Sequence, residues 1–277
     1  MKLWHPYQKL WNDDLLDLLQ KIMPVKRWFY WSRKLVILTD TMLMRFRVNS
    51  RISKRTKAYK SLQEMEDVPV YLFDLGTHKK GEEAVLVINE VFEKYGLNYR
   101  VFSFEASPSI HRQAQETLKP YAKMEVINLA LCEEIPEGGV LKLYNSGNDL
   151  GNTLFGSEEQ EFEEVKAERL STFIQERGLE LDKSVNLLRM NIEGAEYGVL
   201  KDLEAANLLR YFNGFYGTWD DLAKKTSEEK QQEIKRLLTS NNISSLTFNG
   251  RDMHHDRRKE IILADIRSAV LSKRPNA

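Results

Sequence analysis

The stretch LLRMNIEGAEYGVL, residues 187–200, places two carboxylates and a glycine directly after a run of apolar residues. Such a run is typical of a buried strand, and the apolar residues that follow return at helical spacing. Polar groups at the end of a buried element cost free energy unless something bonds to them, and clustered carboxylates often mark function. Glu193 and Gly194 therefore predict a strand-to-helix turn at a functional site. Glu196 is also suited to stabilising the positive end of the helix.

A second turn of this kind occupies FDLGTHKKGEE, residues 73–83. Asp74, Gly76 and Gly81 suit a tight turn that lets the backbone approach a small molecule, although an ordinary strand-to-helix connection has the same composition. The glycine spacing matches neither the G-x-G-x-x-G fingerprint of dinucleotide sites nor the G-x4-G-K-[ST] phosphate loop. The sequence therefore gives little support to pyrophosphate binding at this turn.

Glu105 ends the next predicted strand, residues 99–107, about thirty positions after the glycine turn. A carboxylate in this place accepts hydrogen bonds from both hydroxyls of a ribose, which recognises a nucleoside without requiring its phosphate. The alternative is an acid that stabilises the start of the helix that Pro108 opens.

The polar stretch NGRDMHHDRRK, residues 249–259, offers His254 and His255 beside Asp256. A histidine near its unperturbed pKa is suited to removing the proton of a hydroxyl group. Two solvent-exposed histidines at the tip of a hairpin are the alternative interpretation.

Trp219 and Asp220, at the end of another predicted strand, suit either a sugar-binding face or local packing. Glu193, Asp220 and a histidine together show no recognised metal-ligand spacing. The sequence therefore predicts no metal site.

Segments of strand and helix periodicity alternate beyond residue 68. They predict an α/β fold with a mostly parallel sheet and helices on both faces, because each parallel crossover needs a long connection. Ligands bind outside the carboxyl ends of such strands. The last two strands, residues 243–250 and 259–266, have no helix between them and are expected to form an antiparallel hairpin. The predicted carboxyl ends carry Asp74, Gly76, Glu105, Asn128 to Ala130, Asn191, Glu193 and residues 218–220.

Taken together, several segments resemble the FkbM family of S-adenosylmethionine-dependent methyltransferases, in the family's order: FDLGTHKKGEE, FSFEASP, VINLAL, NSGNDLGNTLF, and RLSTFIQERGL with VNLLRMNIEGAEYGVL. The resemblance implies a class I methyltransferase fold, Rossmann-like, with a seven-stranded sheet. It implies methylation of a hydroxyl, often on a sugar or natural product, with Glu193 beside the reacting groups and S-adenosylmethionine as cofactor. The cofactor contacts predicted from it are Asp74, Gly76, Thr77, Gly81, Glu105, Ala106, Asn128, Ala130 and Asn191.

Two positions depart from the family pattern. The family commonly shows Lys-x-Asp-x-Glu-Gly where this chain has Arg189, Asn191, Glu193 and Gly194. An amide thus replaces an acid at the end of the strand. The first turn is also one residue longer than the family's usual D-x-G-x-N-x-G.

Composition favours a globular protein of the cytoplasm. The chain has 277 residues, 42% of them hydrophobic, and formal net charge zero. Its single cysteine, Cys132, fits a reducing compartment. The sequence contains neither an 18-residue apolar run nor the order of segments that marks a signal peptide, so neither a membrane span nor secretion is expected.

Charge and aromatic residues gather near the beginning of the chain. Residues 21–60 carry six lysines and six arginines against Asp40 alone, a net charge of +11, and four of the five tryptophans precede residue 32. We expect a helical, basic appendage over residues 1–68 and the methyltransferase domain over 69–277. The appendage suits an anionic membrane surface, an acidic glycan, nucleic acid or a partner subunit, or else packs on the domain.

Three functions are compatible with these patterns. The first is O-methylation of a sugar, polysaccharide or natural product, with Glu193, His254 and His255 as the predicted catalytic residues. The second is methylation of RNA recruited by the basic segment. The third is a cofactor-binding module without catalysis, for which the amide at Asn191 is the hint.

Overall fold

The computed structural model describes residues 68–144, 154, 161–192, 194–217, 227–241 and 246–247, together with Ile262, Asp265, Ile266 and Ala269. The chain divides into two units, Met1–Lys57 and Ala58–Ala277, and every described residue belongs to the second unit. The predicted appendage lies almost wholly outside the described residues, so its role and its boundary at residue 68 stay predictions. No described helix is long and apolar enough to cross a membrane.

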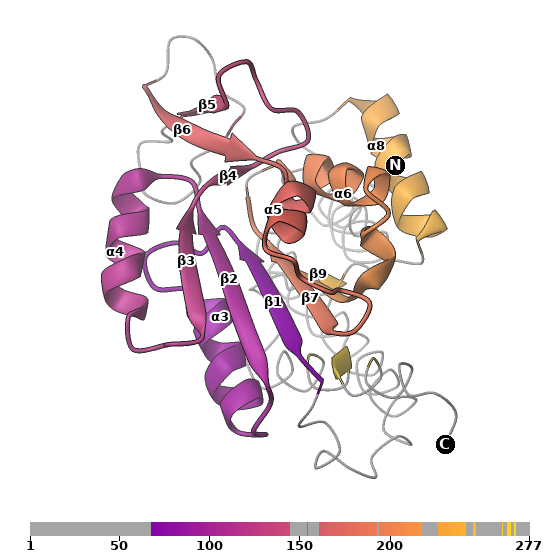
Figure 1. Cartoon of the computed structure of the whole chain (residues 1–277). Helices are drawn as coiled ribbons and strands as arrows, with labels where there is room; N and C mark the ends of the chain where they lie inside the picture. The colour runs from indigo at the N-terminus through magenta and orange to yellow at the C-terminus, as the bar shows by residue number, and fades with distance from the viewer. Residues whose placement is uncertain are drawn as a thin grey trace, which may run out of the picture. The chain divides into compact units, whose positions relative to one another are not determined.

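Parallel strands form the central sheet (Figure 1). The chain builds this sheet outward from β1 to β3 and then returns to the other side of β1 with β7. Open α/β sheets place their ligands at such a reversal of strand order. In spatial order the strands are β3 (Met124–Asn128), β2 (Tyr99–Glu105), β1 (Val70–Leu75), β7 (Val185–Met190), β8 (Phe212–Gly217) and β9 (Leu246–Thr247).

The prediction of seven strands in this sheet is wrong for the part of the chain that the structure describes. There the sheet has five strands of five to seven residues and the two-residue β9. The sequence also predicts a strand over residues 140–147, and its described residues, Val140–Tyr144, contribute instead to a separate small sheet.

The predicted antiparallel hairpin at the end of the sheet is also wrong. Strand β9 runs parallel to β8, and the described residues of the second predicted strand have helical conformation. The physical reason is periodicity: buried side chains recur at the i, i+3, i+4 and i+7 positions of a helix face. These residues are Ile262, Asp265, Ile266 and Ala269.

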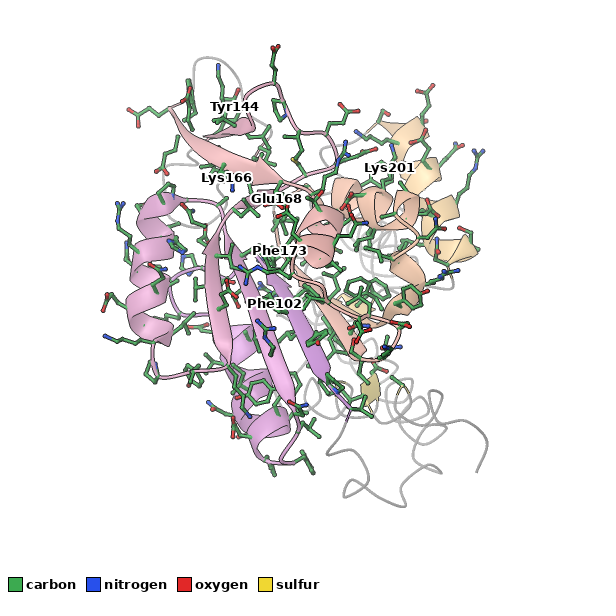
Figure 2. All side chains as sticks on the ribbon, in the orientation of Figure 1. Phe102, Tyr144, Lys166, Glu168, Phe173 and Lys201 are labelled. Carbon is green, nitrogen blue, oxygen red and sulfur yellow. The ribbon has the colours of Figure 1, made fainter. Side chains whose placement is uncertain are left out.

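One face of the sheet is covered through aromatic packing. Phe73 and Phe102 are register partners on β1 and β2, with ring centroids 5.4 Å apart. Phe173, on helix α5 (Leu170–Glu176), meets Phe102 edge-on at 5.4 Å (Figure 2). Helix α6 (Glu196–Ala205) contacts α5 and follows β7 directly.

Helix α3 (Glu82–Val87) covers the opposite face. Successive side chains on a strand point to opposite faces, so Leu72 points away from the layer that contains Phe73. On that side Leu72 lines a pocket together with Ala84 and Val87 of α3. The remaining described helical segments are η3 (Ile88–Glu93), α4 (Pro108–Leu118), η4 (Leu209–Tyr211) and α8 (Glu228–Ser240).

A second, small sheet lies beyond the carboxyl ends of β2 and β3 (Figure 1). Leu143 and Val165 of this sheet form a buried apolar cluster with Ala130, and Ala106 packs against the cluster. The small sheet therefore forms a wall beside the ends of the central strands. Its strands, in spatial order, are β4 (Ala130–Leu131), β6 (Phe162–Glu168) and β5 (Val140–Tyr144).

Candidate active site

The ends of four central strands meet at one edge because their registers match. Leu75 of β1 is level with Phe104 of β2 and Met190 of β7. Glu105, one residue further, is level with Asn128 of β3. The sequence-predicted contacts that the structure brings to this edge are Asp74, Gly76, Thr77, Glu105, Ala106, Asn128, Ala130 and Asn191.

Gly76 occupies a position that only glycine fits. Its φ is +86°, and an added Cβ would lie 2.2 Å from the backbone oxygen of Asn191. The backbone N–H of Asn191 donates to the carbonyl of Leu75 at 3.0 Å. The N–H groups of Gly76 and Thr77 donate to the carbonyl of Phe104 at 3.0 and 3.1 Å. The turn after β1 is thus held against the ends of both β7 and β2.

Asp74 lies beneath this turn, with 1% of the residue exposed. Its Oδ1 accepts a hydrogen bond from Nη1 of Arg189 at 3.0 Å. Its Oδ2 accepts from the hydroxyls of Thr77 at 2.9 Å and Ser103 at 3.3 Å. A buried carboxylate is tolerated when it is paired and hydrogen-bonded in this way. The carboxylate of Asp74 therefore stabilises the conformation of the turn from its buried side.

Glu105 lies at the end of β2 and joins the first turn to the start of α4. Its Oε2 accepts from the backbone N–H of His78, and its Oε1 from that of Ser107, both at 3.0 Å. Burial raises the pKa of Glu105 and the nearby carboxylate of Asp74 adds to this, whereas the backbone N–H bonds oppose the rise. Glu105 is thus a largely buried carboxyl group at the edge where the strand ends meet.

Asn128 fixes the segment that follows β2. Its side-chain amide donates to the carbonyls of Glu105 at 2.9 Å and Ala106 at 2.8 Å. The hydroxyl of the fully buried Ser107 donates to Oε2 of Glu163, on β6, at 3.1 Å. The ends of β2 and β3 and the small sheet are therefore connected by hydrogen bonds as well as by the apolar cluster.

Glu196 organises the turn after β7. The residue is 1% exposed, and its carboxylate oxygens accept from the backbone N–H groups of Ile192 and Gly194, each at 2.9 Å. Glu196 lies in the first turn of α6, and its carboxylate binds N–H groups of the turn that leads into the helix, so the geometry agrees with the helix-stabilising alternative. Glu193 itself lies outside the described residues, so its catalytic role stays a prediction.

Comparison with protein families matches residues 74–226 to the Methyltransferase FkbM domain. The chain belongs to the FkbM methyltransferase family. The match begins at Asp74, covers more than half of the chain and includes the four strand ends. No curated protein and no solved structure shows a significant match to the chain.

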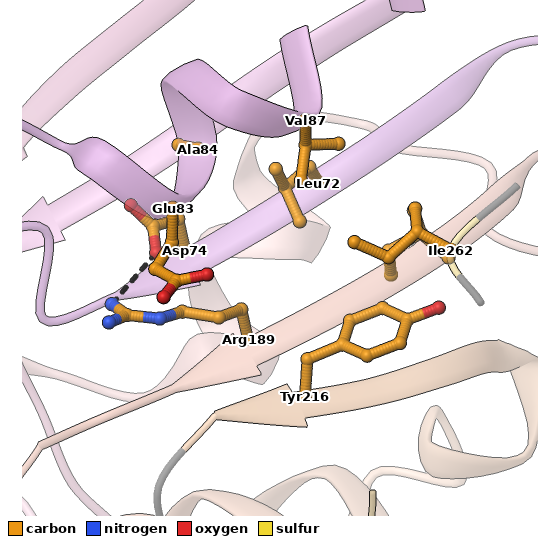
Figure 3. A pocket seen from close by; sticks show the side chains of 9 residues that line it. Leu72, Asp74, Glu83, Ala84, Val87, Arg189, Tyr216 and Ile262 are labelled. Carbon is orange, nitrogen blue, oxygen red and sulfur yellow. Dashed lines mark hydrogen bonds and ion pairs between the residues drawn. The ribbon is translucent and has the colours of Figure 1, made fainter. Parts of the chain in front are cut away.

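A small pocket lies beside the Asp74–Arg189 pair of this FkbM methyltransferase (Figure 3). The hydroxyl of Tyr216, on the pocket wall, donates to Oδ2 of Asp265 at 2.9 Å, and both residues are buried. The bond connects a residue near the end of the chain to β8. The pocket is lined by Leu72, Asp74, Glu83, Ala84, Val87, Leu187, Arg189, Tyr216 and Ile262.

Gly81 is the N-cap residue of α3, with φ +54°. A Cβ there would approach the side chain of Leu118 at 3.0 Å, so the glycine also allows close packing. His254 and His255 lie outside the described residues, as do Trp219 and Asp220, and their roles stay predictions. Among the described residues no group of His, Cys, Asp and Glu is arranged to hold a metal ion.

Sequence reasoning missed three residues of this site. His78 has φ +57° and donates its backbone N–H to Glu105. Ser103, within β2, and Ser107, the residue before α4, are fully buried. The alternation of polar Ser103 within the apolar run YRVFSFE was an available signal for Ser103, because a polar side chain inside a buried strand needs a partner.

Proposed function

We propose that this FkbM methyltransferase uses S-adenosylmethionine to methylate a hydroxyl group on a sugar, polysaccharide or natural product. The observation that carries the proposal is the meeting of the first turn, Glu105 and the end of β7 at one edge of the sheet. This edge coincides with the reversal of strand order between β1 and β7, where open α/β sheets bind nucleosides.

The chemistry of Glu105 fits the ribose of this cofactor. A carboxylate offers about four lone-pair sites, and the hydrogen bonds from His78 and Ser107 take one on each oxygen. The remaining capacity suits the two hydroxyls of a ribose, which are donors. Ala130, in the apolar cluster of the small sheet, and Ala106, which packs against that cluster, suit the flat and largely apolar face of a nucleobase.

S-adenosylmethionine supplies, when bound, a methyl group that is already electrophilic. The protein's contribution is then to orient the acceptor hydroxyl and to remove its proton. We assign the orientation of the acceptor to Glu193, which follows the predicted cofactor contact Asn191 in the sequence, and removal of the proton to His254 or His255. A carboxylate at Glu193 also favours a cationic group in a partly dry cleft.

Titration calorimetry with S-adenosylhomocysteine tests the cofactor. We expect saturable binding by the wild-type protein and binding about tenfold weaker or worse in Glu105→Gln, which loses one acceptor oxygen. Glu116→Gln, at an exposed position on α4, is the matched control and should bind like wild type. Folded wild-type protein that shows no binding would contradict the proposal.

Transfer of labelled methyl groups to a fractionated lysate tests the acceptor. Label in the glycan or small-molecule fraction supports the proposed class. Label in RNA, with binding that weakens steeply as salt rises, would instead support RNA methylation recruited by the basic segment. Cofactor binding with no labelled product in any fraction would favour a module without catalysis.

The remaining proposals concern location and partners. We propose that the protein acts in the cytoplasm, and that residues 21–60, with their net charge of +11, contact an anionic membrane surface, a glycan or a partner subunit. Liposome binding and oligomeric state of the full chain, compared with a chain lacking residues 1–60, test the contact. Unchanged results on deletion would remove this proposal.

A further inference from the structure

Arg189 places one nitrogen at the point where the first turn meets the end of β7. Its Nη1 donates to Oδ1 of Asp74 at 3.0 Å (Figure 3). The same nitrogen donates to the carbonyl of Gly76 at 2.8 Å. The carbonyl of Leu75 lies at 3.4 Å from the same atom. A single guanidinium group on β7 therefore binds the side chain that lies under the turn and the backbone of the turn itself.

The surroundings hold this guanidinium in place. The side chain of Arg189 is 15% exposed, and that of its partner Asp74 is 1% exposed. Within the described part of the chain the buried Nε of Arg189 has no hydrogen-bond partner, so the orientation of the group is set through Nη1. An ion pair shielded from water in this way is stronger than an exposed one, and removing one partner leaves a buried charge without compensation.

The turn and the end of β7 are in direct contact at two further points. The N–H of Asn191 donates to the carbonyl of Leu75 at 3.0 Å. The backbone oxygen of Asn191 also lies close to Gly76, because glycine has no side chain. A Cβ at Gly76 would lie 2.2 Å from that oxygen. Any shift of the turn relative to β7 therefore disturbs Asn191 and the turn after it, which carries Glu193.

We propose that Arg189 is a positioning residue for methyl transfer, which fixes the cofactor-binding turn of β1 against the acceptor side of the site at the end of β7. The inference rests on the proposed function, because it assigns the turn to the cofactor. Arg189 binds neither reactant in this role. It sets the distance between the turn after β1, which holds the methyl donor, and the end of β7, which orients the hydroxyl. Rates of methyl transfer are sensitive to this distance.

Arg189→Lys tests the role while keeping the positive charge that Asp74 requires. Lysine presents a compact ammonium on a flexible stem and lacks the planar guanidinium group whose Nη1 binds Asp74 and Gly76 in one geometry. We expect S-adenosylhomocysteine to bind about tenfold more weakly and kcat with labelled acceptor to fall by a similar factor or more. Arg177→Lys is the matched control, because Arg177 also pairs with a carboxylate, Glu125, but on the exposed surface.

Asp74→Asn provides a second variant that does not depend on the lysine side chain. It keeps the shape of the residue and an oxygen for the hydroxyl of Thr77, and removes the charge that binds Arg189. If both residues act through one contact, the double variant Asp74→Asn/Arg189→Lys loses no more affinity and kcat than the worse single variant. Losses that multiply in the double variant would overturn the inference.

The outcomes separate the inference from the function on which it rests. Wild-type protein that binds no S-adenosylhomocysteine overturns the proposed function. Wild-type binding with unaltered affinity and kcat in Arg189→Lys overturns only the positioning role. A loss of thermal stability in Arg189→Lys with wild-type affinity and kcat at low temperature shows a purely structural residue and overturns the role as well.

Discussion

Glu196 accepts a hydrogen bond from the backbone N–H of Gly194, two residues before it, at 2.9 Å. Its other carboxylate oxygen accepts from the N–H of Ile192 at the same distance. One buried side chain thus holds the backbone on both sides of position 193. The carboxylate belongs to the first turn of α6, so the helix and the turn that leads into it form a single hydrogen-bonded unit.

Glu196→Gln should therefore lower both stability and activity. Glutamine keeps one acceptor oxygen but turns an amide donor toward the second backbone N–H, which leaves a buried donor unsatisfied. We expect a loss of about 2–3 kcal/mol in the free energy of unfolding, measured by urea denaturation. Glu204→Gln, at an exposed position of the same helix, should change stability by less than about 0.5 kcal/mol. Equal losses in the two variants would contradict this account.

Gly76→Ala should be far more damaging than the same change at another glycine with positive φ. The new methyl group would meet the backbone oxygen of Asn191 at 2.2 Å, so the turn has to move. We expect a loss of about 3 kcal/mol or more and no measurable cofactor binding. Gly96→Ala has φ +61° and open space around the added group, so it isolates the backbone cost of about 1–2 kcal/mol. A Gly76→Ala protein as stable as Gly96→Ala would show that the turn is not confined.

The first part of the fold was predictable because its patterns are local. The apolar run before Asp74, the alternation that ends at Glu105 and the glycine turns correspond to β1, β2 and their connections. The sequence also predicts that the ends of these strands lie at one edge of the sheet, because parallel strands all end on the same side of a sheet.

The errors fall where strand and helix patterns compete. The spacing in VKAERLSTFIQERG, residues 165–178, predicts a helix that begins at Val165, yet Val165 to Glu168 belong to β6. Buried Val165 and Ala167 alternate with exposed Lys166, a period-two pattern too short to outweigh the helical residues that follow. Residues 259–266 were predicted as a strand, which their β-branched residues favour, although the spacing of Ile262 and Ile266 also fits a helix.

Partners within the site were beyond sequence reasoning for a different reason. Asp74 and Arg189 are far apart in the chain and meet only because β1 and β7 are register partners at these two positions. The resemblance to the FkbM family implied that Asp74 contacts the cofactor. The structure shows that its carboxylate is occupied by Arg189, Thr77 and Ser103. Which side chains satisfy a buried acid depends on the register, and one sequence does not reveal it.

Tyr216→Phe should weaken the attachment of the last described residues to the sheet. The hydroxyl of Tyr216 donates to Asp265, and both residues are buried. We expect a loss of about 1–3 kcal/mol in unfolding free energy, because Asp265 loses a donor in a dry environment. Faster hydrogen exchange of the backbone near residues 262–269 would locate the effect. Tyr211→Phe, whose hydroxyl accepts from Arg210 at the surface, should leave both measurements unchanged, and equal effects would contradict the proposed attachment.

Stability as a function of pH gives a test of Glu105 that needs no ligand. Burial raises the pKa of Glu105 in the folded protein, so the folded state keeps its proton over a pH range in which the unfolded state has lost it. The contribution of this group to stability is therefore present below the unfolded pKa and decreases as pH rises through the folded one. The difference in unfolding free energy between wild type and Glu105→Gln should fall steadily from about pH 4 toward neutral pH. A difference that stays flat, as expected for the exposed control Glu116→Gln, or that grows with pH would show that burial does not dominate the environment of this carboxyl group.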